Sequence, residues 1–278
     1  MNDFIQQHEM AIRLGFFFGI FILMAVWETL APRRILSLSK AVRWSNNLSI
    51  SILNSVLLRY LFPAAAVSMA VLANNQGWGL FNIIDVPFWL AVAASVMLMD
   101  FVIYLQHLMM HAVPLLWRLH RVHHADPDFD VTTGVRFHPL EIILSLLIKL
   151  AAITILGPSV LAVVIFEVLL NATAMFNHSN IHLPKQLDRV LRRILVTPDM
   201  HRVHHSIEDD EANSNFGFNL PWWDHLFRTY RNQPRAGHTN MTLGIRHFYR
   251  TKEVSWITGM LYLPFRSKAV GTMLNRRE

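Results

Sequence analysis

The sequence predicts an all-α fold: a multi-pass membrane helical bundle with a cytoplasmic, histidine-rich helical cap. The 278 residues are 53% hydrophobic and only 16% charged, whereas soluble domains carry about 25% charged residues. Several apolar runs reach the roughly 20 residues that a helix needs to cross a bilayer. Fifteen histidines and no cysteine are present, which excludes disulfides, thiolate metal sites and cysteine nucleophiles.

Four apolar segments account for the predicted bundle. Three of them are long enough to cross a bilayer once, at residues 11–30, 48–73 and 86–109. A longer segment, 140–175, is interrupted by Gly157-Pro158. This pair predicts a tight helical hairpin, because proline disfavours helical backbone in the residue before it. The hairpin either spans the membrane or is re-entrant, so the sequence predicts four or five membrane helices.

The charges of the loops predict the orientation. Residues 1–10 lack the basic start of a cleaved signal peptide, so the first span is expected to remain as an anchor. Loop 31–47 carries four basic side chains and no acidic one, whereas loop 74–85 carries no Lys or Arg. Basic loops remain in the cytoplasm. We therefore expect an outside N-terminus and a cytoplasmic site, at the inner membrane if the cell is bacterial.

Three regions are expected along the chain: membrane helices at 1–85, a histidine-rich core at 86–230 and a cytoplasmic tail at 231–278. Within the core, the basic amphipathic segment 185–196 either lies in the headgroup plane or packs on the cytoplasmic part. The net charge of +6 is typical of cytoplasmic loops beside anionic lipid. No nucleic acid partner is needed to explain it, and no phosphate-binding glycine loop or nucleophile turn is present.

Ten of the fifteen histidines form two sets with the same spacing. In each set, two histidines at i, i+4 are followed by three at i, i+3, i+4, and such positions share one face of a helix. Such clusters are costly at a membrane edge unless a metal ion uses the imidazole lone pairs. Ten nitrogens are too many for one ion, so the sequence predicts a binuclear site with five ligands per ion. The sets are His107, His111, His120, His123 and His124, and His178, His182, His201, His204 and His205.

Several further residues are candidates for supporting this metal site, because a metal-bound histidine usually donates its other N–H to a carboxylate or carbonyl. Asp100 precedes His107 on the same helix face, and Glu167 and Asn171 precede His178 in the same way. We expect the histidine clusters to be the partners of these intramembrane carboxylates. His138 is a candidate ligand, supporting donor or helix cap, and Asp224 is a further candidate support.

The remaining histidines are expected to lie outside the site. His8, His238 and His247 have no partners at helical spacing and are expected to be solvated. His225 follows Trp222-Trp223-Asp224, and these neighbours favour packing over metal binding.

The ligand type leaves the metal open, since imidazole suits iron, zinc and copper alike. The location is more informative. A site at the cytoplasmic ends of membrane helices faces lipid on one side and a reductant on the other, and this favours oxidation of a lipid by O₂.

The motifs around these histidines resemble those of the fatty acid hydroxylase/sterol desaturase superfamily over residues 88–230. The boxes H-x₃-H, H-x₂-H-H and H-x₂-H-H lie at His107/His111, His120–His124 and His201–His205, with an extra H-x₃-H at His178/His182. Short flanking motifs, such as Asn215-Phe-Gly217 and Asp224-His-Leu-Phe-Arg-Thr-Tyr230, also resemble those of the superfamily. Within the superfamily, the arrangement of its motifs most resembles that of lipid hydroxylases and alkylglycerol monooxygenase.

This resemblance implies a non-haem di-iron centre, with two Fe ions held by the ten histidines and O₂ as co-substrate. It implies a monooxygenase that hydroxylates a C–H bond of a lipid with two external electrons; zinc is a potential replacement for iron. The chain has no flavin, haem or nicotinamide motif, so a ferredoxin or a b₅-type cytochrome with its reductase is the implied donor. The alternatives are a lipid or sterol desaturase on the same di-iron site, and a non-redox zinc-binding membrane protein.

Overall fold

The computed structural model describes residues 2–62, 65–246, 248 and 251–266, and within them it confirms the predicted all-α fold. These residues form helices and loops with two isolated β-bridges and no strand. Five segments are long and apolar enough to cross a membrane, at Phe4–Leu30, Lys40–Ile83, Phe88–Ala112, Pro139–Leu156 and Val160–Asn177. The number of these candidate spans equals the upper number of predicted membrane helices.

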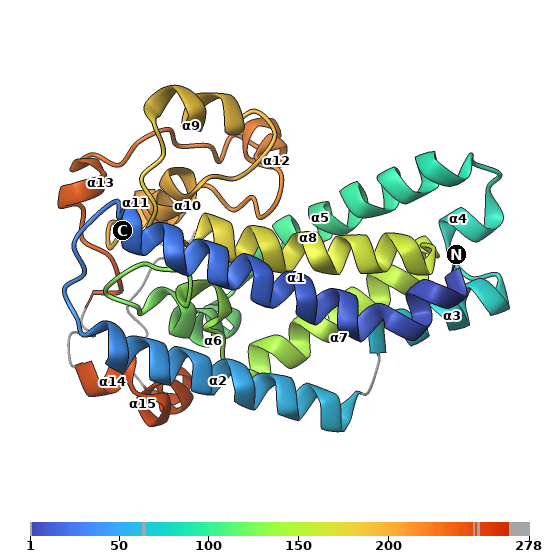
Figure 1. The fold of residues 1–278 in the computed structure, drawn as a ribbon, viewed down its shortest axis with the longest axis horizontal. Coiled ribbons are helices and arrows are strands. Elements are labelled where there is room, and N and C mark those ends of the chain that lie inside the picture. Colours follow the sequence, from blue (N-terminus) through green and yellow to red (C-terminus); the bar gives the residue numbers. More distant parts are fainter. Residues whose placement is uncertain (1, 63–64, 247, 249–250, 267–278) are drawn as a thin grey trace.

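The long helices run side by side along the longest axis of the molecule (Figure 1). They are α1 (Asn2–Leu30), α2 (Lys40–Leu61), α3 (Ala65–Gln76), α5 (Phe88–Ala112), α7 (Pro139–Leu156) and α8 (Val160–Asn177). The predicted second span, 48–73, is divided between α2 and α3, because α2 ends at Leu61. Helix α8 is in contact with α1, α3 and α5 and has the largest buried share of the five segments. It is therefore the central helix of the bundle.

The predicted hairpin consists of α7 and α8, each of 18 residues. Each helix is therefore about 27 Å long, close to the thickness of the hydrocarbon core. The turn packs backbone to backbone on the loop before α4 (Leu80–Ile83). A Cβ atom at Gly157, where φ is +63°, would lie 2.4 Å from the carbonyl oxygen of Trp78, and one at Gly79 would meet Gly157. Glycine is required at both positions.

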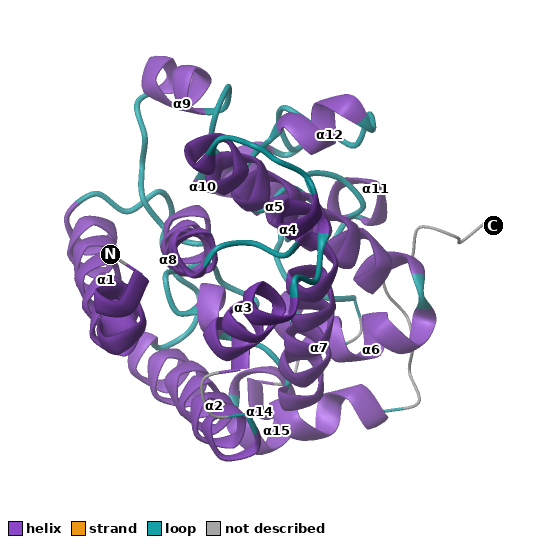
Figure 2. Ribbon diagram, turned by 90° about the vertical axis from the view of Figure 1, so that its right-hand side faces the viewer, coloured by secondary structure: helices purple, strands orange, loops and turns teal. Residues whose placement is uncertain are grey.

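The short helices gather as a cap at one end of the bundle, as Figures 1 and 2 show. They are α6 (Pro114–His124), η1 (Thr133–Val135), α9 (Lys185–Leu191), α10 (Pro198–His204), α11 (Asp209–Ala212), α12 (Trp222–Leu226), α13 (Gly237–Asn240), α14 (Thr251–Ser255), α15 (Ile257–Tyr262) and η2 (Leu263–Phe265). The described part of the tail packs back on this cap. Val254, Met260 and Leu263 form a buried cluster with Trp117 and Val122 of α6.

A buried ionic network fixes the loop that follows α6. Arg43 of α2 is fully buried and pairs with Asp126 and Asp130, and Arg136 lies 4.0 Å from Asp126. Arg43 also donates to Thr133. A basic residue that the sequence places in a loop beside lipid is thus the internal anchor between α2 and the cap, and this loop borders the histidines described next.

Candidate metal centre

Nine histidines converge in two adjacent groups inside the cap. Within each group, one ring nitrogen from every member lies within 4.8 Å of the others. All nine side chains are buried, and none is more than 7% exposed. The first group is His107, His111, His120, His124 and His204; the second is His123, His178, His201 and His205.

Four helices position these side chains. Helix α5 contributes His107 and His111 from one face of its last turns, and His178 is the C-cap of α8. Helices α6 and α10 each contribute to both groups, because their three histidines lie on two neighbouring faces. The two groups touch where the rings of His124 and His205 stack, with centroids 4.4 Å apart.

This arrangement corrects the expected division of the ligands. The spacing in the sequence assigns His123 to the first five and His204 to the second five. In the structure these two residues are exchanged: His204 of α10 lies with the α5 histidines, and His123 of α6 lies with His178. The reason is tertiary, because α6 and α10 face each other across the centre and each points one histidine at the other group.

Hydrogen bonds at Nδ1 orient five of the rings. Nδ1 of His107, His178 and His204 lies 2.7–2.9 Å from the backbone oxygens of Phe216, Ala174 and Ser214, respectively. Nδ1 of His123 lies 3.3 Å from the oxygen of Arg136, and Nδ1 of His120 lies 2.6 Å from Oε1 of Glu141. An acceptor at this position fixes the proton on Nδ1 and leaves the lone pair on Nε2.

The released lone pairs point at one another. Nε2 of His178 lies 3.0 Å from Nε2 of His123 and 3.1 Å from Nε2 of His201. In His178 and His123 both Nδ1 atoms face an oxygen, so no proton is left to place between their Nε2 atoms. Nitrogen atoms at this separation match two ligands about 2.1 Å from a shared ion. Four further Nε2 atoms are buried without a hydrogen-bond partner, those of His107, His120, His204 and His205.

The electrostatics favour neutral imidazoles. Burial lowers the pKa of His178 and of His204 to about 3, and it also lowers the pKa of His201 and His205 well below the ordinary value. Neutral imidazole is the form that binds a metal ion. Inward lone pairs, unpartnered Nε2 atoms and neutral rings therefore fit a site for two cations.

His182 does not join either group. Helix α8 ends at Asn177, and the chain then forms a loop in which Ile181 pairs with Pro32 in an isolated bridge. The i, i+4 spacing of His178 and His182 is therefore not helical, and the His182 side chain is exposed. The structure brings together nine of the ten predicted ligands and leaves this one outside.

The intramembrane carboxylates have partners other than the histidines. Glu167 accepts a hydrogen bond from Lys149 at 2.7 Å and lies 3.3 Å from Arg13. Asn171 donates to the Glu167 carbonyl one turn earlier, and not toward the site. The expectation that the histidine clusters pair with Glu167 is wrong, because basic groups on α1 and α7 neutralise it.

Asp100 and Asp224 act on the site through a loop. Asp100 accepts hydrogen bonds from the backbone of Asn219 and Leu220 and from Trp223 Nε1. Asp224 accepts from the backbone N–H groups of Phe216 and Gly217, and burial raises its pKa to about 6. Neither carboxylate has a histidine as a hydrogen-bond partner. Together they hold the segment whose Phe216 carbonyl orients His107.

His138 caps the next helix. Its Nδ1 accepts a hydrogen bond from the N–H of Leu140, in the first turn of α7, and its Nε2 lies 3.3 Å from the Leu261 carbonyl. Of the three roles that the sequence leaves open, the structure places it in the capping position.

Glu141 is the supporting residue that sequence reasoning missed. It lies in the first turn of α7, is 3% exposed and contacts His120 directly. The available signal was a carboxylate at the start of an apolar span, three residues after His138 and at the end of the span nearer the histidine boxes. The spacing relative to other histidines cannot find it, because its partner lies on a different helix.

The remaining histidines differ from one another. His8 is exposed, as expected, and the His225 ring packs against the Tyr230 ring at a tilt of 30°, with centroids 4.2 Å apart. The expectation for His238 is wrong: it is buried and its Nε2 lies 3.6 Å from Asp199. His247 lies outside the described residues.

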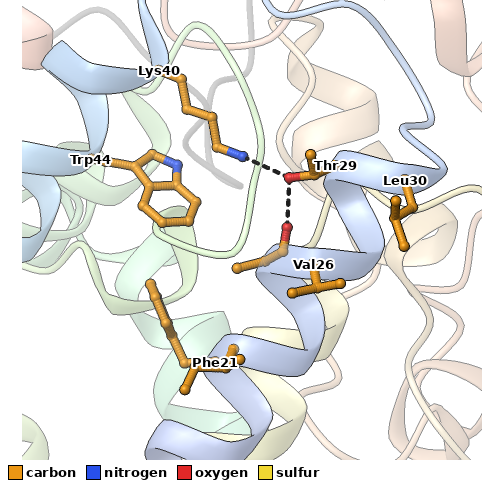
Figure 3. Close-up of a pocket in the computed structure, with 8 residues that line it drawn as sticks. Phe21, Val26, Thr29, Leu30, Lys40 and Trp44 are labelled. Carbon is orange, nitrogen blue, oxygen red and sulfur yellow. Dashed lines mark hydrogen bonds between the residues drawn. The ribbon is translucent and has the colours of Figure 1, made fainter.

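An open apolar groove of about 430 Å³ lies between α1 and α2, away from these groups. Figure 3 shows the Lys40 ammonium group hydrogen-bonded to Thr29 at its edge, near the Trp44 ring. The lining consists of Phe21, Ile22, Ala25, Val26, Thr29, Leu30, Lys40 and Trp44. No histidine lines it, so the groove belongs to the outer face of the bundle and not to the metal centre.

Fold and site together define a class: an all-helical membrane protein with buried histidine groups that could hold metal ions. Residues 92–229 match the family model described as fatty acid hydroxylase, and this part of the chain belongs to that family. The match contains all nine clustered histidines, which confirms the resemblance drawn from the boxes.

Relatives in the same superfamily carry several named activities. The chain is 28% identical to the ornithine lipid hydroxylase OlsE of Rhizobium tropici, over 56% of this chain and 46% of that protein. It is 28% identical to human alkylglycerol monooxygenase, over 64% of this chain and 38% of the relative. The rice very-long-chain aldehyde decarbonylase GL1-11 is 25% identical, over 64% of this chain and 71% of the relative. The chain thus covers less than half the length of the first two, and no solved structure matches it.

Proposed function

We propose that the protein is a membrane-bound di-iron oxygenase that hydroxylates a C–H bond of a lipid with O₂ and two external electrons. The observation that carries the proposal is the pair of buried imidazole groups at the end of lipid-exposed helices. Relatives named as a lipid hydroxylase and as alkylglycerol monooxygenases support the same reaction class.

The nine clustered histidines would hold the two ions, five on one and four on the other. Bound iron would supply the activation of O₂, which no side chain provides. The chain itself orients the ligands through Glu141 and the backbone oxygens described above. Phe129 and Phe216 are fully buried; Phe129 lies against rings of the second group and Phe216 against rings of the first. These side chains exclude water from the imidazoles, which keeps the site dry and the ligand field fixed.

Two electrons must come from another protein, because the sequence has no flavin, haem or nicotinamide motif. We propose a ferredoxin or a b₅-type cytochrome with its reductase as the donor. The positive-inside pattern of the loops supports a cytoplasmic position for the cap, where such donors are found.

The test combines metal analysis with product analysis. The purified chain, loaded with iron and supplied with donor, reductant and lipid under ¹⁸O₂, should yield a product that gains one labelled oxygen atom. Loss of two hydrogens without oxygen would instead indicate a desaturase on the same centre. A protein that retains only zinc and consumes no O₂ with any donor, even after iron loading, would contradict the oxygenase proposal and favour a non-redox zinc protein.

A further inference from the structure

We propose that α9 and α12 form a membrane-inserted surface that sits at the headgroup–acyl boundary of the leaflet next to the histidine cap. This α9–α12 surface has six large apolar side chains, between 44% and 66% exposed: Leu187, Val190, Ile194, Trp222, Leu226 and Phe227. Four exposed basic residues border it: Lys185, Arg189, Arg193 and Arg228. Its occupant is the bilayer itself, with anionic lipid opposite the basic border.

The orientation of α9 is the first argument. Leu187 and Val190 face outward together with the polar residues of α9 other than Asp188. Asp188 is buried, accepts a hydrogen bond from Thr197 at 2.6 Å and pairs with Arg192. A helix with its apolar side turned to water loses about 25 cal/mol for each Å² of apolar surface that stays exposed. An exposed face that mixes apolar and basic side chains in this way is stable where its surroundings are partly apolar, as at a lipid surface.

The two elements form one surface. The indole Nε1 of Trp222 donates a hydrogen bond of 2.6 Å to the carbonyl of Arg193, just after α9. Figure 1 shows α9 and α12 on the same flank of the cap. The apolar side chains of the two helices therefore face the same surroundings.

The depth of α12 is the second argument. Phe227 stacks on Phe101 and Tyr104 of α5, with centroids 5.8 and 5.5 Å apart, and Trp223 donates to Asp100. Asp100 lies twelve residues before Ala112, which is about 18 Å along the helix. Helix α12 is thus docked against the side of α5, and the last turns of α5, which carry His107 and His111, continue beyond this contact into the cap.

The outer face of α5 extends the same apolar area, since Leu105 and Met109 are 39% and 41% exposed. The surface is therefore continuous with a membrane segment. Aromatic rings such as Trp222 favour the membrane interface, and basic side chains on an amphipathic surface favour anionic headgroups. The composition fits a lipid surface better than water or an acidic protein, and the inference does not depend on which reaction the metal centre performs.

The absence of cysteine from the chain allows a direct test. Single variants Val190→Cys and Leu226→Cys carry a nitroxide label in nanodiscs of phosphatidylcholine and phosphatidylglycerol. The collision rates of the label with O₂, which concentrates in lipid, and with a water-soluble nickel chelate give its depth. Leu23→Cys, exposed in the C-terminal half of α1, is the lipid reference, and Ala236→Cys, exposed beside α13, is the aqueous reference.

Both test positions should resemble Leu23→Cys, with an O₂ to nickel collision ratio several-fold above that of Ala236→Cys. Size-exclusion profiles and helical circular dichroism equal to those of the parent chain establish that each variant is folded. A ratio equal to the aqueous reference at either position would overturn the proposal. Shielding of either label from both reagents would also overturn it, because a protein contact would then cover the surface.

Discussion

The Oε1 atom of Glu141 lies 2.6 Å from Nδ1 of His120, with both side chains buried. A carboxylate in this position fixes the ring orientation and strengthens the nitrogen that faces the metal. Among the described residues, Glu141 is the carboxylate that forms a hydrogen bond with one of the nine clustered histidines. Its effect on the metal should therefore be separable from that of other buried acids.

Glu141→Ala should lower metal affinity by about 10–100-fold, as losses of such supporting contacts do. Glu141→Gln keeps a hydrogen-bond acceptor but loses the charge, so its metal affinity should lie between those of Glu141→Ala and the parent chain. The measurement is iron per chain after dialysis against a graded chelator. Glu167→Gln is the matched control, because this buried carboxylate pairs with Lys149 and Arg13. An equal loss of metal in both variants would show that Glu141 has no special role.

His204→Ala should reduce the bound metal to about one ion per chain and reduce product more than 100-fold, because the first group loses the ligand that α10 supplies. His182→Ala should retain both metal and activity, since this exposed side chain lies outside both groups. Elemental analysis and turnover on the same preparations test the pair. Loss of metal in His182→Ala would place this residue back among the ligands.

The stability of the cap should depend on Asp126 at low pH. Burial would raise the pKa of this carboxyl, but Arg43 and Arg136 outweigh it and lower the pKa to about 2. A lowered pKa stabilises the folded state above the unfolded value near 4, and this stabilisation is lost as the pH falls toward 2. The free energy of unfolding of the metal-free protein should fall by about 2 kcal/mol from this group over that range.

Asp126→Asn should show a flatter pH dependence and be roughly 3 kcal/mol less stable near pH 7, because Arg43 would then be buried without one of its partners. Asp210→Asn is the control, since this half-exposed carboxylate pairs with Arg231 and Arg235 at the surface and such pairs contribute little. Denaturant unfolding in detergent at pH 5 and pH 3 compares them. If the free energy of unfolding of Asp126→Asn changed with pH as steeply as that of the parent chain, Asp126 would not be the group responsible for the loss of stability.

Gly157→Ala should destabilise the hairpin by roughly 3 kcal/mol or more, because the new Cβ is strained at positive φ and collides with backbone. Gly77→Ala isolates the strain: its φ is +67°, and nothing lies within 4 Å of the added atom. This control should cost about 1 kcal/mol. Thermal unfolding midpoints in detergent give the comparison, and similar midpoints for both variants would mean that the contact between the two turns is unimportant.

The sequence predicts those features that depend on local spacing. The apolar runs predict the spans, and the i, i+4 pair His107 and His111 predicts one helix face, because both follow from helical periodicity. The same rule fails for His182, because a helix end that no glycine or proline marks decides where the periodicity stops. Helical spacing also does not predict the exchange of His123 and His204 between the two groups, because this exchange depends on how α6 and α10 pack.

Partners of buried charges show the same limit. Glu167 is recognisable as a residue that needs a partner, but the choice of Lys149 and Arg13 over the histidines is made by the packing of α1, α7 and α8. The role of Glu141 likewise exists only once α7 packs beside α6. Long-range contacts of this kind have no period in the sequence, so a single chain reveals the need for a partner and not its identity.

The mixed membership of the two histidine groups bears on how the protein is made. His204 is translated 84 residues after His120, yet both belong to one group. Neither group can close while the nascent chain is still shorter than about residue 205, even though α5 and α6 are already complete. Binding of the proposed ions would therefore be a late event in biosynthesis. A polypeptide terminated before that point would enter the membrane with both histidine groups incomplete.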